Sequence, residues 1–141
     1  MPRTHTTALR VRYAETDQMG VVYHANYLRF MERARSDMLS VAGIDQRRAM
    51  EAGEGAYAVA RMNIRYLAPA KLDDALLIAS KLREVRAAHV VIHQQVRRDG
   101  VILTEAEVVA ALVAPDGRPR RQPADWIARY RTYVDQGEPV A

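Results

Sequence analysis

The chain has 141 residues, of which 49% are hydrophobic and 27% charged, proportions of an ordinary globular protein that disfavour fibrous and intrinsically disordered classes. It contains no cysteine, which excludes disulfides, thiolate metal ligands and a cysteine nucleophile. Its formal net charge is +4, and its length predicts a single domain over residues 1–141.

The first predicted elements are a short strand and one long helix. Residues 8–14, ALRVRYA, alternate apolar and basic side chains, as a strand with one buried face does. From about residue 24 to residue 42, apolar or small residues recur every three or four positions, which predicts an amphipathic helix. Gly43 stands where a left-handed C-terminal cap is expected. The buried stripe would consist of Tyr27, Met31, Ala34, Met38 and Ala42, widened by Leu28 and Leu39.

Four further strands and a terminal helix are predicted downstream. A connection of small residues, EAGEGA, leads into strand-like segments at 57–67, 76–85, 89–97 and 101–114, and RRDG between the last two is typical of a tight hairpin turn. After PDGRPRRQP, apolar residues from Trp126 to Val134 recur with helical spacing. Because the long helix and the strands must bury their apolar faces against each other, the sequence predicts a two-layer α+β domain.

The segment YAETDQMGVVYHANY, residues 13–27, places an acid, a glycine and a histidine just before the long helix. The first N–H groups of a helix lack partners within it and, with the helix dipole, form an electropositive end. Such groups stabilise the oxyanion that develops at a carbonyl under attack. Since cysteine is absent, Asp17 is the candidate nucleophile or general base, and Gly20 would allow a sharp turn or a close ligand.

Each of these residues also has a structural explanation. Asp17 can be a turn residue that accepts hydrogen bonds from nearby N–H groups. His24 can start the helix or be a hydrogen-bonded core histidine, and the tyrosines Tyr13, Tyr23 and Tyr27 can simply pack. Taken one residue at a time, catalysis is therefore the minority interpretation.

The longer segment RVRYAETDQMGVVYHANYLRFMERAR, residues 10–35, resembles the signature of hotdog-fold acyl-CoA thioesterases of the 4-hydroxybenzoyl-CoA thioesterase and YbgC-like type. IRYLAPAKLDD and RRDGVILTEAEVVAALVAPDGRPRR match further parts of these proteins, so the resemblance covers residues 9–122. It implies the hotdog fold, a long central helix wrapped by a five-stranded antiparallel sheet, to which the short C-terminal helix is an addition. It also implies a homodimer or homotetramer with active sites between subunits.

The resemblance further implies hydrolysis of acyl-CoA to a free acid and CoA, without a metal or a cofactor. Asp17 takes the position of the catalytic aspartate, either as nucleophile or as general base, and His24 and Tyr13 take assisting positions. The oxyanion-binding N–H falls at the helix start near His24. The expected substrate-binding residues are Gly20, Tyr23, Ala25, Asn26 and Arg65.

Several alternatives stay open. Some hotdog thioesterases use a glutamate on the central helix, which makes Glu32 a second candidate, although its place on the polar face favours a surface ion pair. His89 and His93 share one face of a strand but lack a third ligand, so we expect no metal site there. A hotdog hydratase or dehydratase and a non-catalytic acyl-thioester-binding protein are the competing functions.

The basic residues bear on partners and location. Only Lys71 and Lys81 are lysines, and arginine forks suit the phosphates of CoA. Nucleic-acid binding is not expected, because basic and acidic residues are interspersed and no helix-turn-helix pattern is present. The first ten residues lack a secretory signal and no apolar run could span a membrane, which predicts a cytoplasmic protein. Candidate phosphate-binding arginines are Arg61, Arg65, Arg86, Arg118, Arg120 and Arg121.

Overall fold

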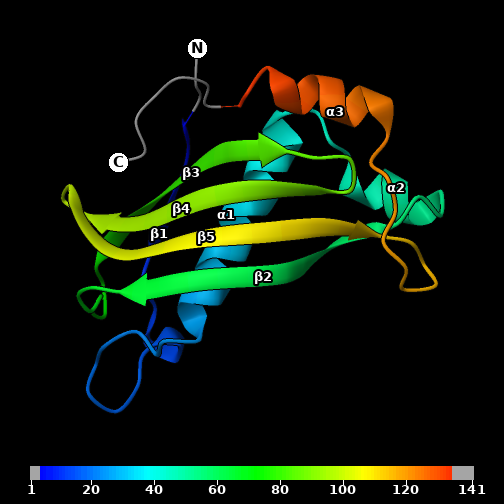
Figure 1. Cartoon of the computed structure of the whole chain (residues 1–141). Coiled ribbons are helices and arrows are strands. Elements are labelled where there is room, and N and C mark those ends of the chain that lie inside the picture. The colour runs from blue at the N-terminus through cyan, green and yellow to red at the C-terminus, as the bar shows by residue number, and fades with distance from the viewer. Residues whose placement is uncertain (1–3, 135–141) are drawn as a thin grey trace.

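Five antiparallel strands form one curved sheet, and a long helix lies across one of its faces (Figure 1). The computed structural model describes residues 4–134. The strands follow the spatial order β1-β3-β4-β5-β2, so β3, β4 and β5 form a meander and β2 lies at one edge. This is the predicted hotdog fold. Its elements are β1 (Thr4–Arg10), η1 (Tyr13–Glu15), α1 (Asn26–Val41), α2 (Gln46–Glu51), β2 (Ala56–Tyr66), β3 (Ala75–Val85), β4 (His89–Arg98), β5 (Val101–Val113) and α3 (Ala124–Arg131).

The apolar stripe of α1 forms the centre of the core, as the helical periodicity predicts. Met31 and Ala34 are fully buried and belong to one cluster with Ile78 of β3 and Val108 of β5. Leu28 was expected in the stripe but is 42% exposed, because it lies on the flank of α1 that the sheet does not cover. A second cluster lies toward the C-terminal half of α1.

The helix α3 closes this second cluster. Trp126 and Tyr130 are buried against residues from α1 and the sheet, and Arg129 donates a hydrogen bond of 3.1 Å to the carbonyl of Gly43. Gly43 has a φ of 84°, which is the left-handed cap that the sequence predicts at the end of α1. The predicted C-terminal helix is thus present and holds the end of α1.

One predicted boundary was wrong, and one short helix was not predicted. The first strand was expected at residues 8–14 but spans Thr4–Arg10, opposite β3 from Lys81 to Ala75. Backbone hydrogen bonds between Val11 and residues 73–74 continue the pairing for one more residue, and the chain then turns through η1. The connection after α1 contains the short helix α2, whose N-cap Asp45 accepts a hydrogen bond of 3.0 Å from the Arg48 N–H.

The β4–β5 hairpin turns at Asp99 and Gly100, with φ values of 51° and 79°. Both lie in the left-handed region that a type I′ turn requires, which confirms the hairpin predicted from RRDG. None of the helices within residues 4–134 is both long and apolar enough to cross a membrane.

Candidate active site

The loop that precedes α1 projects away from the sheet and the helix (Figure 1). A bridge between Thr16 and Val22 closes its base, and the Asp17 N–H donates a hydrogen bond of 2.8 Å to the Val21 carbonyl. Asp17 Oδ1 accepts hydrogen bonds from the N–H groups of Met19 at 2.8 Å and Val21 at 3.4 Å. Gly20 has a φ of 76°, which a glycine adopts without strain. Within one chain, Asp17 is therefore an exposed residue that orders its own loop.

The start of α1 keeps unpaired N–H groups. Its N-cap, Ala25, has helical backbone angles and no side chain able to cap the helix. The N–H groups of Asn26 and Tyr27 bond to the carbonyls of Tyr23 at 2.8 Å and His24 at 3.3 Å. Those of His24 and Ala25 form no hydrogen bond with any residue from 4 to 134. Two free donors thus lie at the positive end of the helix dipole.

An aromatic cluster surrounds this helix start. The His24 ring lies with its centroid 4.6 Å from that of Tyr23 and 6.2 Å from that of Tyr66, and the Tyr66 hydroxyl donates a hydrogen bond of 3.3 Å to the His24 carbonyl. Burial, and then the neighbouring Tyr27, raise the pKa of Tyr66. Asn26 Nδ2 donates a hydrogen bond of 2.8 Å to the Glu15 carbonyl, which ties α1 to η1. His24 is therefore held in a defined aromatic environment.

A sequence profile of the thioesterase superfamily matches residues 19–111, more than half of the chain. This chain belongs to the thioesterase superfamily. The acyl-CoA thioester hydrolase YbgC of Escherichia coli is 39% identical over 125 residues, which cover 87% of this thioesterase and 92% of that protein. The family predicted from the sequence is confirmed.

Solved structures agree with this assignment. A protein from Thermus thermophilus superposes with a TM-score of 0.84 at 32% identity, over 92% of this chain and 98% of the other. A DHNA-CoA thioesterase from Staphylococcus aureus superposes with a TM-score of 0.86 at 25% identity, over 92% and 89%. Both likenesses extend over nearly the whole domain.

The fold of this thioesterase gathers some of the predicted site residues and separates others. Tyr23, His24, Ala25 and Asn26 lie together at the helix start, with Gly20 in the preceding loop. Tyr13 is 81% exposed and lies in η1, away from the residues that cluster at the helix start.

Arg65 lies on the outer face of β2, opposite Glu105 of β5 in the register, whereas its neighbour Tyr66 reaches His24. Tyr66 was not predicted as a site residue. The alternation of Met62, Ile64 and Tyr66 with polar residues is visible in the sequence, but nothing there indicated that β2 would end beside His24.

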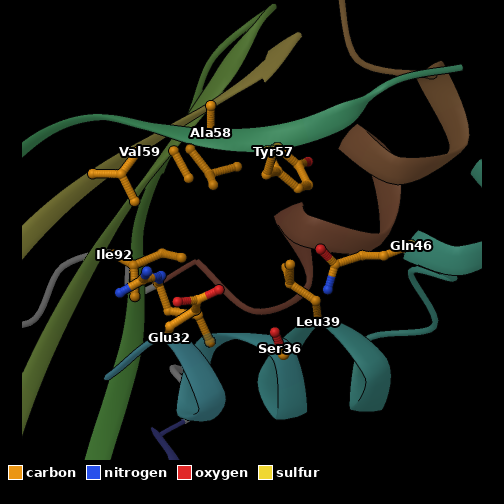
Figure 2. A pocket seen from close by; sticks show the side chains of 11 residues that line it. Glu32, Ser36, Leu39, Gln46, Tyr57, Ala58, Val59 and Ile92 are labelled. Carbon is orange, nitrogen blue, oxygen red and sulfur yellow. The ribbon is translucent and has the colours of Figure 1, made fainter. Parts of the chain in front are cut away.

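A cavity of about 200 Å³ lies between α1, α2 and the sheet (Figure 2). Glu32, Arg35 and Ser36 of α1 and Gln46 of α2 form its polar lining, and neither Asp17 nor His24 reaches it. Glu32 was expected to be a surface residue. Its side chain is exposed, as expected, but its carboxylate also points toward this cavity (Figure 2).

His89 and His93 of β4 lie on the outer face of the sheet. His93 Nε2 is 3.2 Å from Glu105 Oε1, and this interaction lowers the pKa of Glu105. No group of three His, Cys, Asp or Glu residues within the described chain could hold a metal ion.

Proposed function

We propose that this thioesterase hydrolyses acyl-CoA thioesters, and that the reaction takes place at the start of α1. The observation that carries the proposal is the pair of unpaired N–H groups, at His24 and Ala25, at the positive end of α1. A thioester carbonyl that accepts from these N–H groups becomes more electrophilic, and the oxyanion formed on attack is stabilised by about 3 kcal/mol per donor. The similarity to acyl-CoA thioester hydrolases supports CoA esters as the substrate class.

Asp17 supplies the attacking group or the base in this proposal. Its Oδ1 is engaged by its own loop, whereas Oδ2 forms no hydrogen bond with another residue of the described chain. Oδ2 can attack the carbonyl carbon to give a mixed anhydride and release CoA thiolate, after which water cleaves the anhydride. Alternatively it removes a proton from a water molecule that attacks directly. His24, Tyr13 and Tyr66 would orient the substrate or the water.

A second copy of the chain completes this site in the proposal. The Asp17 loop projects from the domain, and β2 presents an unpaired edge along its 11 residues, which natural sheets normally cover. Pairing of two β2 edges would form one continuous sheet and a homodimer, from which a tetramer can be built. Analytical ultracentrifugation should show at least a dimer, and a stable monomer with full activity would contradict this part.

The decisive experiment compares two aspartates with the same local role. Asp17 accepts from Met19 N–H at 2.8 Å, and Asp116 accepts from Arg118 N–H at 2.9 Å, also two residues ahead in an exposed turn. Asp17→Asn should lower kcat/KM for acyl-CoA at least about a hundredfold, while the control Asp116→Asn should not. Near-normal turnover by Asp17→Asn, with an unchanged circular dichroism spectrum, would exclude Asp17 as the central group.

The position of Glu32 at the cavity favours a second candidate for the base. If Glu32 rather than Asp17 activates water, Glu32→Gln should abolish turnover and Asp17→Asn should retain it. For an active Asp17, single turnover in oxygen-18 water tests the covalent route. Label in the Asp17 carboxylate indicates a mixed anhydride that water cleaves at the aspartyl carbonyl, whereas label only in the released acid fits the general base or an anhydride cleaved at its acyl carbonyl.

Two other functions predict different results with the same protein. A hydratase or dehydratase would convert crotonyl-CoA without releasing CoA. A non-catalytic binder would retain CoA esters of several chain lengths without hydrolysing any of them. Release of free CoA from an acyl-CoA panel by the wild type, lost in Asp17→Asn, would exclude both.

A further inference from the structure

The cavity beside α1 contains a buried positive charge. Arg35 is only 8% exposed, although it lies on α1 among apolar residues. Its Nη1 donates a hydrogen bond of 3.0 Å to Gln94 Oε1 of β4. Gln94 is itself fixed, because its Nε2 donates to the Met31 carbonyl and to Ser80 Oγ, both at 2.9 Å. The guanidinium is therefore held in place at the wall of the cavity.

The Arg35 guanidinium has more hydrogen-bond donors than acceptors around it. A guanidinium has five N–H donors, and Gln94 occupies one of them. Arg35 forms no ion pair with any carboxylate between residues 4 and 134, and Glu32 acts on it only at longer range. A buried cation with so few acceptors is unfavourable unless another oxygen reaches it. The cavity is the open side from which such an oxygen can come.

The rest of the cavity has both apolar and polar walls. Figure 2 shows Glu32, Ser36 and Leu39 of α1 facing Tyr57 and Val59 of β2 across the space, with Ile92 of β4 at its side. Aliphatic side chains thus line the cavity together with a cationic group and other polar side chains. A ligand that fills it should combine an apolar part with an oxygen that reaches Arg35.

Arg35 also lies at a suitable distance from the proposed reaction centre. It is ten residues after Ala25, which corresponds to about 15 Å along the axis of α1. The thioester carbonyl and the guanidinium therefore contact opposite ends of an acyl group rather than the same atom.

We infer that Arg35 is a specificity-determining residue that selects acyl groups whose far end carries a hydrogen-bond-accepting oxygen, an inference that rests on the proposed function. A carboxylate and a hydroxyl both supply such an oxygen. Glu32 lines the same cavity and would repel a carboxylate, whereas a hydroxyl can donate to Glu32 and accept from Arg35. Of the two, the ω-hydroxyacyl group is the better match.

The test uses acyl-CoA esters matched in length. Hexanoyl-CoA is compared with adipoyl-CoA and ω-hydroxyhexanoyl-CoA, and decanoyl-CoA with sebacoyl-CoA and ω-hydroxydecanoyl-CoA. At the better length, the wild type should show a kcat/KM for the ω-hydroxyacyl ester at least about tenfold above that of the plain ester, the usual effect of a hydrogen bond to a charged group. A preference for the ω-carboxyl ester would identify the carboxylate as the source of the oxygen.

Variants connect the preference to Arg35. Arg35→Met should reduce the ratio of the two kcat/KM values to about one, Arg35→Lys should keep part of it, and the exposed Arg131→Met should keep all of it. Equal rates for plain and ω-oxygenated esters in the wild type would overturn the inference, with no variant needed. A preference that survives in folded Arg35→Met would overturn it as well.

Failure of the proposed function can be distinguished from failure of the inference about Arg35. If the wild type hydrolyses none of these esters, the proposed function fails, and calorimetric titration with the intact ω-hydroxydecanoyl-CoA and decanoyl-CoA then decides the inference. Tighter binding of the ω-hydroxyacyl ester that is lost in Arg35→Met would support the role of Arg35. Equal binding of the two esters would overturn it.

Discussion

Gln94 connects the central helix to the sheet, and its replacement by leucine should be among the most destabilising single changes in the chain. The side chain is fully buried and accepts from Arg35 of α1 while donating to the Met31 carbonyl and Ser80 Oγ of β3. Gln94→Leu removes all three hydrogen bonds without removing volume. The buried guanidinium of Arg35 and the buried hydroxyl of Ser80 are then left without these partners.

The loss of stability in Gln94→Leu can be estimated from the groups that it leaves unpaired. A lost hydrogen bond to a charged group is worth about 2 kcal/mol, and a stranded buried hydroxyl adds about 1–2 kcal/mol. We therefore expect Gln94→Leu to lower the free energy of unfolding by about 3–4 kcal/mol. Arg35→Met should cost less, since it removes the buried charge together with its bond. The double variant should be more stable than the sum of the single effects predicts, by about 2 kcal/mol.

Urea denaturation at one fixed protein concentration measures these free energies, because association would otherwise shift them. Gln95 offers the matched control. It is also buried, but it bonds to Glu105 and Arg97 on the other face of β4. Gln95→Leu and Arg35→Met should therefore add within about 0.5 kcal/mol. The reasoning is refuted if Gln94→Leu and Arg35→Met also add within that margin, or if Gln94→Leu costs less than about 1 kcal/mol.

Two further predictions concern a carboxylate and two glycines. Burial alone would raise the pKa of Asp74, but hydrogen bonds from the Lys71 N–H and Arg98 outweigh it and hold that pKa below its usual range. The Asp74 carboxylate therefore stabilises the folded state fully at a pH above the carboxyl pKa of the unfolded chain. This stabilisation is lost as the pH falls through the carboxyl pKa of the folded chain. Asp74→Asn should cost about 1 kcal/mol at pH 7 and progressively less as the pH falls into the acid range, and a cost that does not change with pH would contradict this origin. Gly55 and Gly100 both have positive φ, 117° and 79°, but an added Cβ would clash with the Val113 carbonyl only at Gly55. In thermal unfolding, Gly100→Ala should cost about 1–2 kcal/mol and Gly55→Ala clearly more, and equal costs would show that the clash relaxes.

Local patterns along the chain were sufficient for most of the architecture. The stripe that includes Met31 and Ala34 has helical periodicity, so the buried face of α1 follows from side-chain geometry alone. The RRDG turn is equally local, because Asp and Gly tolerate the left-handed angles that it requires. A local signal that was present but overlooked is Asp45, whose capping side chain marks the start of α2.

The composition of the site depended on contacts between distant residues. The helix start with His24 was predicted from the residues before α1, and the structure leaves its N–H groups unpaired there. Tyr66 reaches the His24 carbonyl across 42 positions, and Arg35 meets Gln94 across 59.

The sequence by itself determined which residues form the helix, the strands and the turn, because those choices depend on backbone angles and on spacing between near neighbours. Only the tertiary structure decided that an arginine would be buried and that a tyrosine would cover the helix start. The order of the strands selects those neighbours, and burial makes the free energy of each polar group depend on them.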